Sequence, residues 1–304
     1  MIKIEDVAYV AFKAPDLDKM ARFLNDFGLS TWLDRGCLYA HGLGPAPYLH
    51  MTEQGDAGFS ALGLRAASVA DVIALGQAEG IEPYDLQRPG GGMAITLHDL
   101  DGHKIEVLAG QKSTAEEALP SSDGWNDAYE KARLRRPKRL DRSPAHVVRL
   151  GHCVLSVSDF RRSERWYKER FGFITSDEIA AAPDVAIGAF LRCDRGDIPT
   201  DHHSLFLMQH PAGLGFHHAA FEVVDVDDLL SGHDFLVKAG WEPEWGVGRH
   251  LLGSQIFDYW RDPWKHKLEH WTDGDLFTAA DGSRVATLAD LMSVQWGPDA
   301  PVTM

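Results

Sequence analysis

The sequence of 304 residues is poor in cysteine, in long apolar runs and in positive charge, and each shortage argues against a class of protein. Its three cysteines, Cys37, Cys153 and Cys193, are odd in number and far apart, which favours reduced thiols in a cytoplasm over a disulfide framework. The sequence contains no apolar run long enough to cross a bilayer, and its N-terminal residues do not form the pattern of a signal peptide. A formal net charge of −15 argues against a nucleic-acid partner. We therefore expect a cytoplasmic protein that has neither a membrane nor a nucleic acid as its partner.

The rest of the composition, 44% hydrophobic and 25% charged, is that of a globular chain long enough for two domains. Alternating and helical patterns repeat the order β-α-β-β-β four times, which predicts an α+β fold of four modules paired into two domains. We expect helices at 17–27, 69–79, 162–171 and 226–239. The expected strands lie at 5–13, 31–34, 37–41, 48–52, 59–66, 94–97, 104–108, 150–157, 189–192, 203–208, 217–223, 255–260 and 267–271.

The composition changes between the second and third modules, where Ser, Glu, Lys, Arg and Pro predominate, as in an interdomain linker. We predict an N-terminal domain over 1–112, a linker over 113–147, a C-terminal domain over 148–277 and a tail over 278–304. The tail carries Leu288, Leu291, Met292 and Trp296 at roughly helical spacing. The sequence leaves open whether the tail covers a cavity or forms a contact between subunits.

The two halves of the sequence can be superposed, because 99–107 matches 262–270 in its pattern of charged and apolar residues. In this register Glu106 corresponds to Glu269. We also pair Tyr9 with His152 and Ser60 with His218. Only the second half then carries two histidines and a carboxylate, so we expect the first domain to be a scaffold without metal.

His152, His218 and Glu269 are the candidate metal ligands, since two imidazoles and one carboxylate suit Fe(II) and leave one face of the ion open. A carboxylate among apolar and aromatic neighbours is costly to bury unless a cation faces it, and Glu269 stands in such a segment. The alternative is that all three are ordinary strand residues. Their occurrence together at repeat-related positions favours the metal site, although His217 next to His218 is a rival ligand.

The motifs GHCVLSV, HHSLFLM, HHAAFEV, GRH, DYW and LEHW, together with the four modules, resemble a known family. The chain looks like a type I extradiol ring-cleavage dioxygenase of the vicinal oxygen chelate (glyoxalase–bleomycin resistance–dioxygenase) superfamily, similar to 2,3-dihydroxybiphenyl and catechol 2,3-dioxygenases. The resemblance covers nearly the whole chain and is strongest over 150–275. It departs from some members at Val154, Leu251 and Leu252, where those members carry polar residues, so we expect a difference in substrate and not in the reaction.

The resemblance implies an enzyme of two vicinal-oxygen-chelate domains that inserts both atoms of O2 into a catecholic substrate and opens the ring beside the diol. It implies Fe(II), or alternatively Mn(II), held by His152, His218 and Glu269. His203 matches the acid–base histidine of the family, and His250 and Tyr259 match the pair that binds the substrate hydroxyl and the oxygen-derived groups. We also expect a homo-oligomer.

Each of these three residues has a plainer interpretation. His202 adjoins His203, and a shift of one residue would exchange them. Tyr259 suits a packed aromatic, and His250 falls in a predicted loop, where histidines are commonly solvated. Two other functions also stay open. One is a metal-dependent isomerase or transferase of the glyoxalase type, which generally lacks the combination of His203, His250 and Tyr259. The other is a binding protein without metal.

Overall fold

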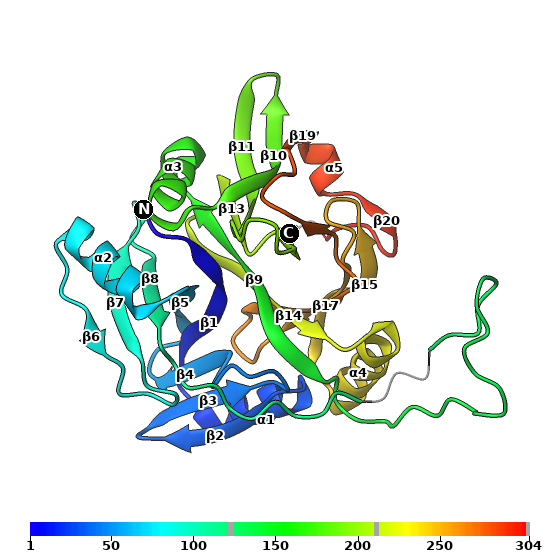
Figure 1. Cartoon of the computed structure of the whole chain (residues 1–304). Coiled ribbons are helices and arrows are strands. Elements are labelled where there is room, and N and C mark those ends of the chain that lie inside the picture. Colours follow the sequence, from blue (N-terminus) through cyan, green and yellow to red (C-terminus); the bar gives the residue numbers. More distant parts are fainter. Residues whose placement is uncertain (121–123, 210–212, 302–304) are drawn as a thin grey trace.

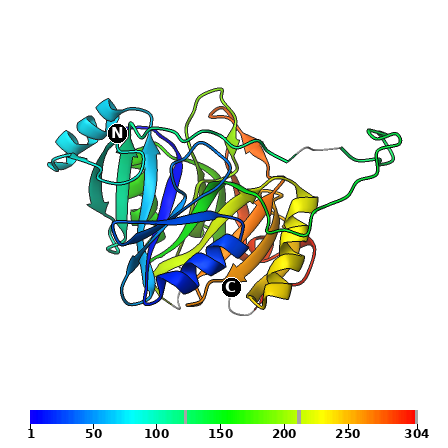
Figure 2. The same cartoon turned by 90° about the horizontal axis from the view of Figure 1, so that it is seen from below.

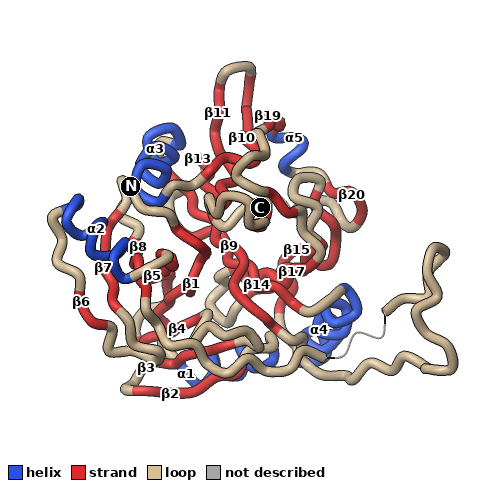
Figure 3. The backbone as a smooth tube through the Cα atoms, viewed as in Figure 1, coloured by secondary structure: helices blue, strands red, loops and turns tan. Residues whose placement is uncertain are grey.

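The computed structural model describes residues 1–120, 124–209 and 213–301 and consists mainly of two large sheets with helices on their outer sides (Figures 1 and 3). The predicted α+β class and the two-domain arrangement are confirmed. In the described part of the chain, no helix combines the length and the apolar character that a membrane span requires.

The first sheet contains eight strands from two β-α-β-β-β modules, in the order β2-β3-β4-β1-β5-β8-β7-β6. Its helices begin at the side-chain caps Asp16 and Ser68, which accept hydrogen bonds from backbone N–H groups in the first turn. The first module contains β1 (Ile4–Ala14), α1 (Leu17–Asp26), β2 (Ser30–Asp34), β3 (Cys37–His41) and β4 (His50–Gln54). The second contains β5 (Gly58–Ala66), α2 (Val69–Glu79), β6 (Tyr84–Asp85), β7 (Met93–His98) and β8 (Lys104–Ala109).

The second sheet repeats this order with ten strands, β19-β10-β11-β13-β9-β14-β17-β16-β15-β20. The third module contains β9 (Val147–Val157), α3 (Phe160–Phe171), β10 (Ile174–Ala182), β11 (Val185–Arg192) and β13 (Leu205–Gln209). The fourth contains β14 (Gly215–Val223), α4 (Val226–Ala239), β15 (Glu242–His250), β16 (Ile256–Arg261) and β17 (Lys267–Thr272). A separate two-stranded ribbon pairs β12 (Thr200–Asp201) with β18 (Leu276–Phe277).

The tail contributes β19 (Arg284–Thr287), α5 (Leu288–Leu291) and β20 (Val294–Trp296). Strand β19 pairs with β10 at one edge of the second sheet, and β20 pairs with β15 at the opposite edge. The expected helical spacing therefore holds only for the short α5, because Trp296 lies on a strand. The tail links the two edges of the sheet (Figure 1).

The strand register corrects one part of the internal repeat. Glu106 lies opposite Gly63, and Glu269 lies opposite Ala220, so Gly63 corresponds to Ala220. Counting back two residues, His218 corresponds to Ala61 and not to Ser60. The pairing predicted from the sequence was wrong by one residue at this strand, and such a shift changes the face on which a side chain lies.

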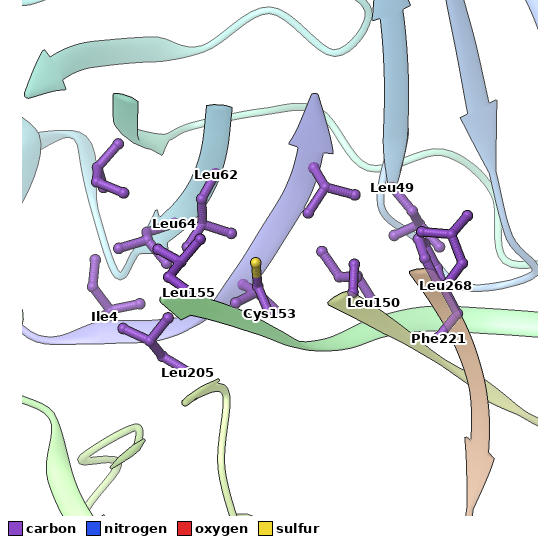
Figure 4. Packing of buried hydrophobic residues seen from close by; sticks show 14 of the residues in the cluster. Ile4, Leu49, Leu62, Leu64, Leu150, Cys153, Leu155, Leu205, Phe221 and Leu268 are labelled. Atoms are coloured by element: carbon purple, nitrogen blue, oxygen red, sulfur yellow. The ribbon is translucent and has the colours of Figure 1, made fainter. Parts of the chain in front are cut away.

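The two domains share one hydrophobic core, because β1 and β9 lie side by side where the sheets meet (Figure 1). Figure 4 shows Leu62 and Leu64 of the first domain packed near Cys153 and Leu155 of the second. Cys153 is fully buried there, and burial raises the pKa of its thiol, so it is a core residue. All three cysteines are free thiols, as predicted.

Polar contacts also join the domains. Nε2 of His270 lies 2.7 Å from the carbonyl oxygen of Phe27, and the two rings stack with centroids 3.8 Å apart. Helices α1 and α4 lie next to each other (Figure 2), and the indole of Trp241 donates to Asp26 across 2.8 Å. Described residues of the segment between β8 and β9, C-terminal to residue 123, project beyond α4 in both Figures 1 and 2.

Candidate metal centre

Three adjacent strands of the second sheet carry the predicted ligand set. His152 lies on β9, His218 on β14 and Glu269 on β17, and these strands are neighbours in the sheet. Oε2 of Glu269 is 3.3 Å from Nε2 of His152 and 3.3 Å from Nε2 of His218. The two Nε2 atoms are also 3.3 Å apart. Three donor atoms thus form a small triangle although 117 residues separate the first ligand from the last (269 − 152).

The charges of this triangle suit a cation. Burial lowers the pKa of His218, which therefore offers a neutral imidazole. Burial raises the pKa of Glu269, but His152 and His218 outweigh it and hold that pKa below its ordinary value. Glu269 is fully buried, and neither of its oxygens makes a well-aligned hydrogen bond to a described residue. An ionised carboxylate in that position needs a positive partner, so the donor set fits a divalent cation.

At the equivalent position of the first domain, Glu106 is surrounded by hydrogen-bond donors of the protein. Glu106 accepts hydrogen bonds from the hydroxyls of Tyr9 at 2.6 Å and Tyr84 at 2.7 Å. It also forms an ion pair with Arg88, whose Nη1 donates to Tyr9 across 3.0 Å. The guanidinium supplies the positive charge that Glu106 requires. In this arrangement a side chain of the protein is the cationic partner of Glu106.

A cavity of about 700 Å³ opens beside the triangle, and His203, His250 and Tyr259 line it together with His152 and His218. The rings of His152 and His203 lie with centroids 4.0 Å apart. Nε2 of His250 is 3.1 Å from the hydroxyl of Tyr259. The structure therefore brings all six residues selected from the sequence to one place, while their roles stay predictions.

The protonation states of the cavity residues follow from their burial. Burial, followed by the neighbouring histidines, lowers the pKa of His203 well below its ordinary value. Burial lowers the pKa of His250 to about 4. Burial and the adjacent Glu269 raise the pKa of Tyr259 well above its ordinary value. At neutral pH the cavity offers two neutral imidazoles and one phenolic O–H donor.

The neighbouring histidines have separate surroundings. His203 lines the cavity, whereas Nε2 of His202 lies 2.7 Å from Asp177 and its Nδ1 lies 3.1 Å from Nδ1 of His203. His217 and His218 both line the cavity, but only His218 belongs to the triangle.

Two expectations about the local structure around these histidines were wrong. His250 ends strand β15 and is not in a loop. His203 precedes β13 and is not within it. Tyr259 is both packed among aromatics and exposed to the cavity.

Other residues around the cavity were not among the six selected from the sequence. Trp245 packs against the rings of His250 and Tyr259, with both centroid distances 5.5 Å. The side chain of Gln255 lines the cavity, and its Nε2 makes no hydrogen bond within the described residues. Asp177 is the partner of His202. The high tryptophan content of residues 241–271 was a signal for Trp245. No sequence pattern connects Asp177 on β10 with a histidine 25 residues later.

Comparison with known proteins agrees with this geometry. Residues 149–270 match the family model described as Glyoxalase/Bleomycin resistance protein/Dioxygenase superfamily. Metapyrocatechase 2 of Cupriavidus necator is 29% identical over 312 aligned residues, which cover 98% of this chain and 90% of that relative. The chain is therefore similar along nearly its whole length to a relative that is named for ring cleavage.

Two solved structures share the fold. The Mn(II)-bound glyoxalase from Novosphingobium aromaticivorans has a TM-score of 0.81 and 24% identity, with 100% of this chain and 95% of that chain covered. Homoprotocatechuate 2,3-dioxygenase from Brevibacterium fuscum, solved with 3,4-dihydroxyphenylacetate, has a TM-score of 0.80 and 19% identity, with 99% and 91% covered. Together these findings confirm the resemblance to the extradiol dioxygenases of this superfamily.

Proposed function

We propose that this chain, which shares its fold and motifs with the extradiol ring-cleaving dioxygenases of the glyoxalase superfamily, is itself such an enzyme and opens a catecholic ring with O2. The observation that carries the proposal is the triangle of His152, His218 and Glu269 at the base of a cavity that also holds His203, His250 and Tyr259. In the reaction, both atoms of O2 enter the product and the ring carbon–carbon bond beside the diol breaks.

His152, His218 and Glu269 would hold the metal, which we propose to be Fe(II), with Mn(II) as the alternative. The bound ion supplies a place where the diol and O2 are held side by side and lets electrons pass from the ring to oxygen. Only one carboxylate among the three ligands leaves the site with net positive charge, which favours an ionised diol.

The other three residues handle protons and position the substrate. The neutral imidazole of His203 accepts a proton from the substrate diol and returns it to a product oxygen. The hydroxyl of Tyr259 donates a hydrogen bond to the substrate oxygen, and Nε2 of His250, 3.1 Å from that hydroxyl, holds its orientation. The aromatic residues around them exclude water from the reacting groups.

Metal analysis and oxygen uptake test this proposal in one preparation. Protein purified without oxygen should carry about one iron per chain and consume O2 on addition of a catechol, with a yellow ring-opened product. His218→Ala should lose iron, because it removes a ligand. His203→Phe should keep iron but turn over roughly 10²-fold to 10⁴-fold more slowly.

The results also separate the rival functions. Bound metal without oxygen uptake on any catechol would favour the glyoxalase-type isomerase, a reading that the fold of the Mn(II)-bound glyoxalase supports. Protein that retains no metal would favour the binding protein. If both variants keep metal and full activity, the assignment of His218 and His203 is wrong.

The assembly and the location of the protein stay proposals. We propose a homo-oligomer, for which sedimentation is the test. We propose a cytoplasmic enzyme, because all three cysteines are buried free thiols. The domain bounds 1–112 and 148–277 also stay a proposal, and limited proteolysis within 113–147 would test them.

A further inference from the structure

We propose that the cavity selects catechols that carry an uncharged, apolar substituent about the size of a second aromatic ring, and that it rejects catechols with a carboxylate. This inference rests on the proposed function, because it names the class of substrate for the same site. It draws on the volume of the cavity, the residues of its wall and the charges that these residues lack.

The cavity is larger than a catechol requires. A benzene ring is accommodated in roughly 150 Å³ in a protein interior, whereas this cavity measures about 700 Å³. The triangle and the catalytic histidines fix the diol at one end. The remaining volume therefore lies beyond the ring, where a substituent would project.

The wall of that remaining volume is apolar. Val154, Phe190 and Phe206 belong to a cluster that is separate from the main core. The rings of Phe190 and Phe206 stack with centroids 4.1 Å apart, and Phe190 also packs edge-on against His203 at 4.7 Å. The apolar wall thus begins directly beside the proposed acid–base residue. Flat aromatic faces of this kind favour a second ring on the substrate.

The tail adds to the apolar wall. Leu288, Leu291 and Met292 line the cavity, and Leu291 packs against the Phe190–Phe206 cluster. Leu252 joins them from the turn after β15. Val154 and Leu252 are two of the positions at which the sequence departs from family members with polar residues, and both face the cavity.

The wall offers no counter-charge to a carboxylate. None of the described residues that line the cavity is a lysine or an arginine. The polar groups of the lining other than the histidines and Tyr259, such as Ser156, Gln209 and Gln255, are uncharged. Burial of an unpaired carboxylate is costly, so a charged side arm would weaken binding.

A substrate panel on the iron-loaded protein tests the inference. We would measure kcat/KM by oxygen uptake for catechol, 3-phenylcatechol, 4-phenylcatechol and 3,4-dihydroxyphenylacetate. At least one phenylcatechol should exceed catechol by about tenfold or more. The carboxylated compound should fall below catechol. A preference for catechol itself or for 3,4-dihydroxyphenylacetate would overturn the inference and leave the proposed dioxygenase function standing.

Binding without oxygen separates the two proposals further. Anaerobic titration calorimetry with the same four compounds should give the lowest Kd for a phenylcatechol, with a negative heat-capacity change from burial of apolar surface. That order of affinities without any oxygen uptake would support the inference and overturn the proposed reaction. Equal affinities for all four compounds would overturn the inference.

A pair of variants tests whether the apolar wall of the cavity determines the substrate preference. Leu291→Trp fills the space proposed for the substituent, so the ratio of kcat/KM for the preferred phenylcatechol to that for catechol should fall at least fivefold. Val285→Trp places the same bulk on the exposed face of β19, away from the cavity, and should leave that ratio unchanged. An unchanged ratio in Leu291→Trp, with the protein folded, would contradict the proposed position of the substituent.

Discussion

Glu106 and Glu269 are buried carboxylates at equivalent strand positions, and they obtain their positive partners in different ways. Arg88 and two tyrosines surround Glu106, whereas Glu269 faces two imidazoles and no lysine or arginine among the described residues pairs with it. An ionised side chain is rarely buried without a partner. Comparison of the two sites therefore supports a metal at the second and a purely structural ion pair at the first.

We expect Arg88→Gln to destabilise the protein by about 3 kcal/mol, because it leaves the Glu106 carboxylate buried without its cation. Urea unfolding would measure the loss. The double variant Arg88→Gln, Glu106→Gln removes both charges and should recover most of it. If the single variant is as stable as the unmodified protein, Arg88 is not the partner that stabilises Glu106.

The buried His50 leads to a prediction of how the free energy of unfolding depends on pH. Burial, and then the nearby His266, lowers the pKa of His50 to about 3 in the folded protein, against about 6.5 in the unfolded chain. The unfolded state therefore binds more protons below pH 6.5. The contribution of neutral His50 to the free energy of unfolding is therefore fully present above pH 6.5, and it is lost as the pH falls below that value.

The ring of His50 stacks on Phe12 with centroids 4.9 Å apart, so His50→Phe preserves the shape of this contact. Between pH 6.5 and 5.5 the unmodified protein should lose about 1 kcal/mol more stability than the variant. Urea unfolding at several pH values would measure this difference. His98→Phe, at an exposed position, is the control. Parallel pH profiles for the His50→Phe variant and the unmodified protein would contradict the prediction.

The sequence predicted which residues form the candidate site better than it predicted the secondary structure of those residues. His152, His218 and Glu269 were found because repeat-related strands carry them, and the three side chains converge in space. His203 and His250 were selected by resemblance, while their secondary structure was wrong. Asp177 could not be predicted, because its contact with His202 depends on strand pairing between distant segments.

Among the elements, strand β9 carries the closest packing around the site. A Cβ added at Gly151 would lie 2.5 Å from the indole of Trp271, two residues after Glu269. We expect Gly151→Ala to cost about 1–3 kcal/mol, because the ring has to move. Its displacement should also reduce iron retention, measured by metal analysis.

Gly58→Ala provides the matched control for this change, since the added Cβ on β5 would meet no atom within 4 Å. Equal stability of the two alanine variants would contradict the proposed contact between Gly151 and Trp271.

Element prediction succeeded where a periodic pattern was strong and failed where it was not. Helix α4 was predicted at its observed bounds, and β3 likewise. Strand β10 was missed, because its sequence ITSDEIAAA mixes charged and small residues without alternation. The misplacement of Ser60 against His218 has a different cause, namely that the shared start of the two strands was overlooked. Both begin with Gly-Phe, and this pair, Gly58-Phe59 and Gly215-Phe216, aligns Ala61 and not Ser60 with His218.

At the scale of the whole molecule, the shared core couples the metal centre to the first domain. The main cluster contains buried residues from both sheets, and His270, next to Glu269, contacts the backbone of Phe27. We therefore expect one cooperative thermal transition for both domains. Removal of the metal with a chelator should lower the midpoint temperature of this single transition by several degrees, because bound metal stabilises only the folded state.

Differential scanning calorimetry of the iron-loaded and chelated protein would measure the shift. His218→Ala is the control, and its transition should not respond to the chelator. Two separate transitions, of which only one moves on chelation, would show that the domains unfold independently.

The tail has a consequence for engineering the enzyme. Strand β19 holds one edge of the second sheet and β20 holds the other, and only the residues between Thr287 and Val294 connect them across the cavity. Leu288, Leu291 and Met292 of this connection line the cavity, so we expect its length to affect the size of the molecules that the cavity accepts. Insertion or deletion of residues there would widen or narrow the range of accepted molecules while the reacting groups on β9, β14 and β17 stay in place.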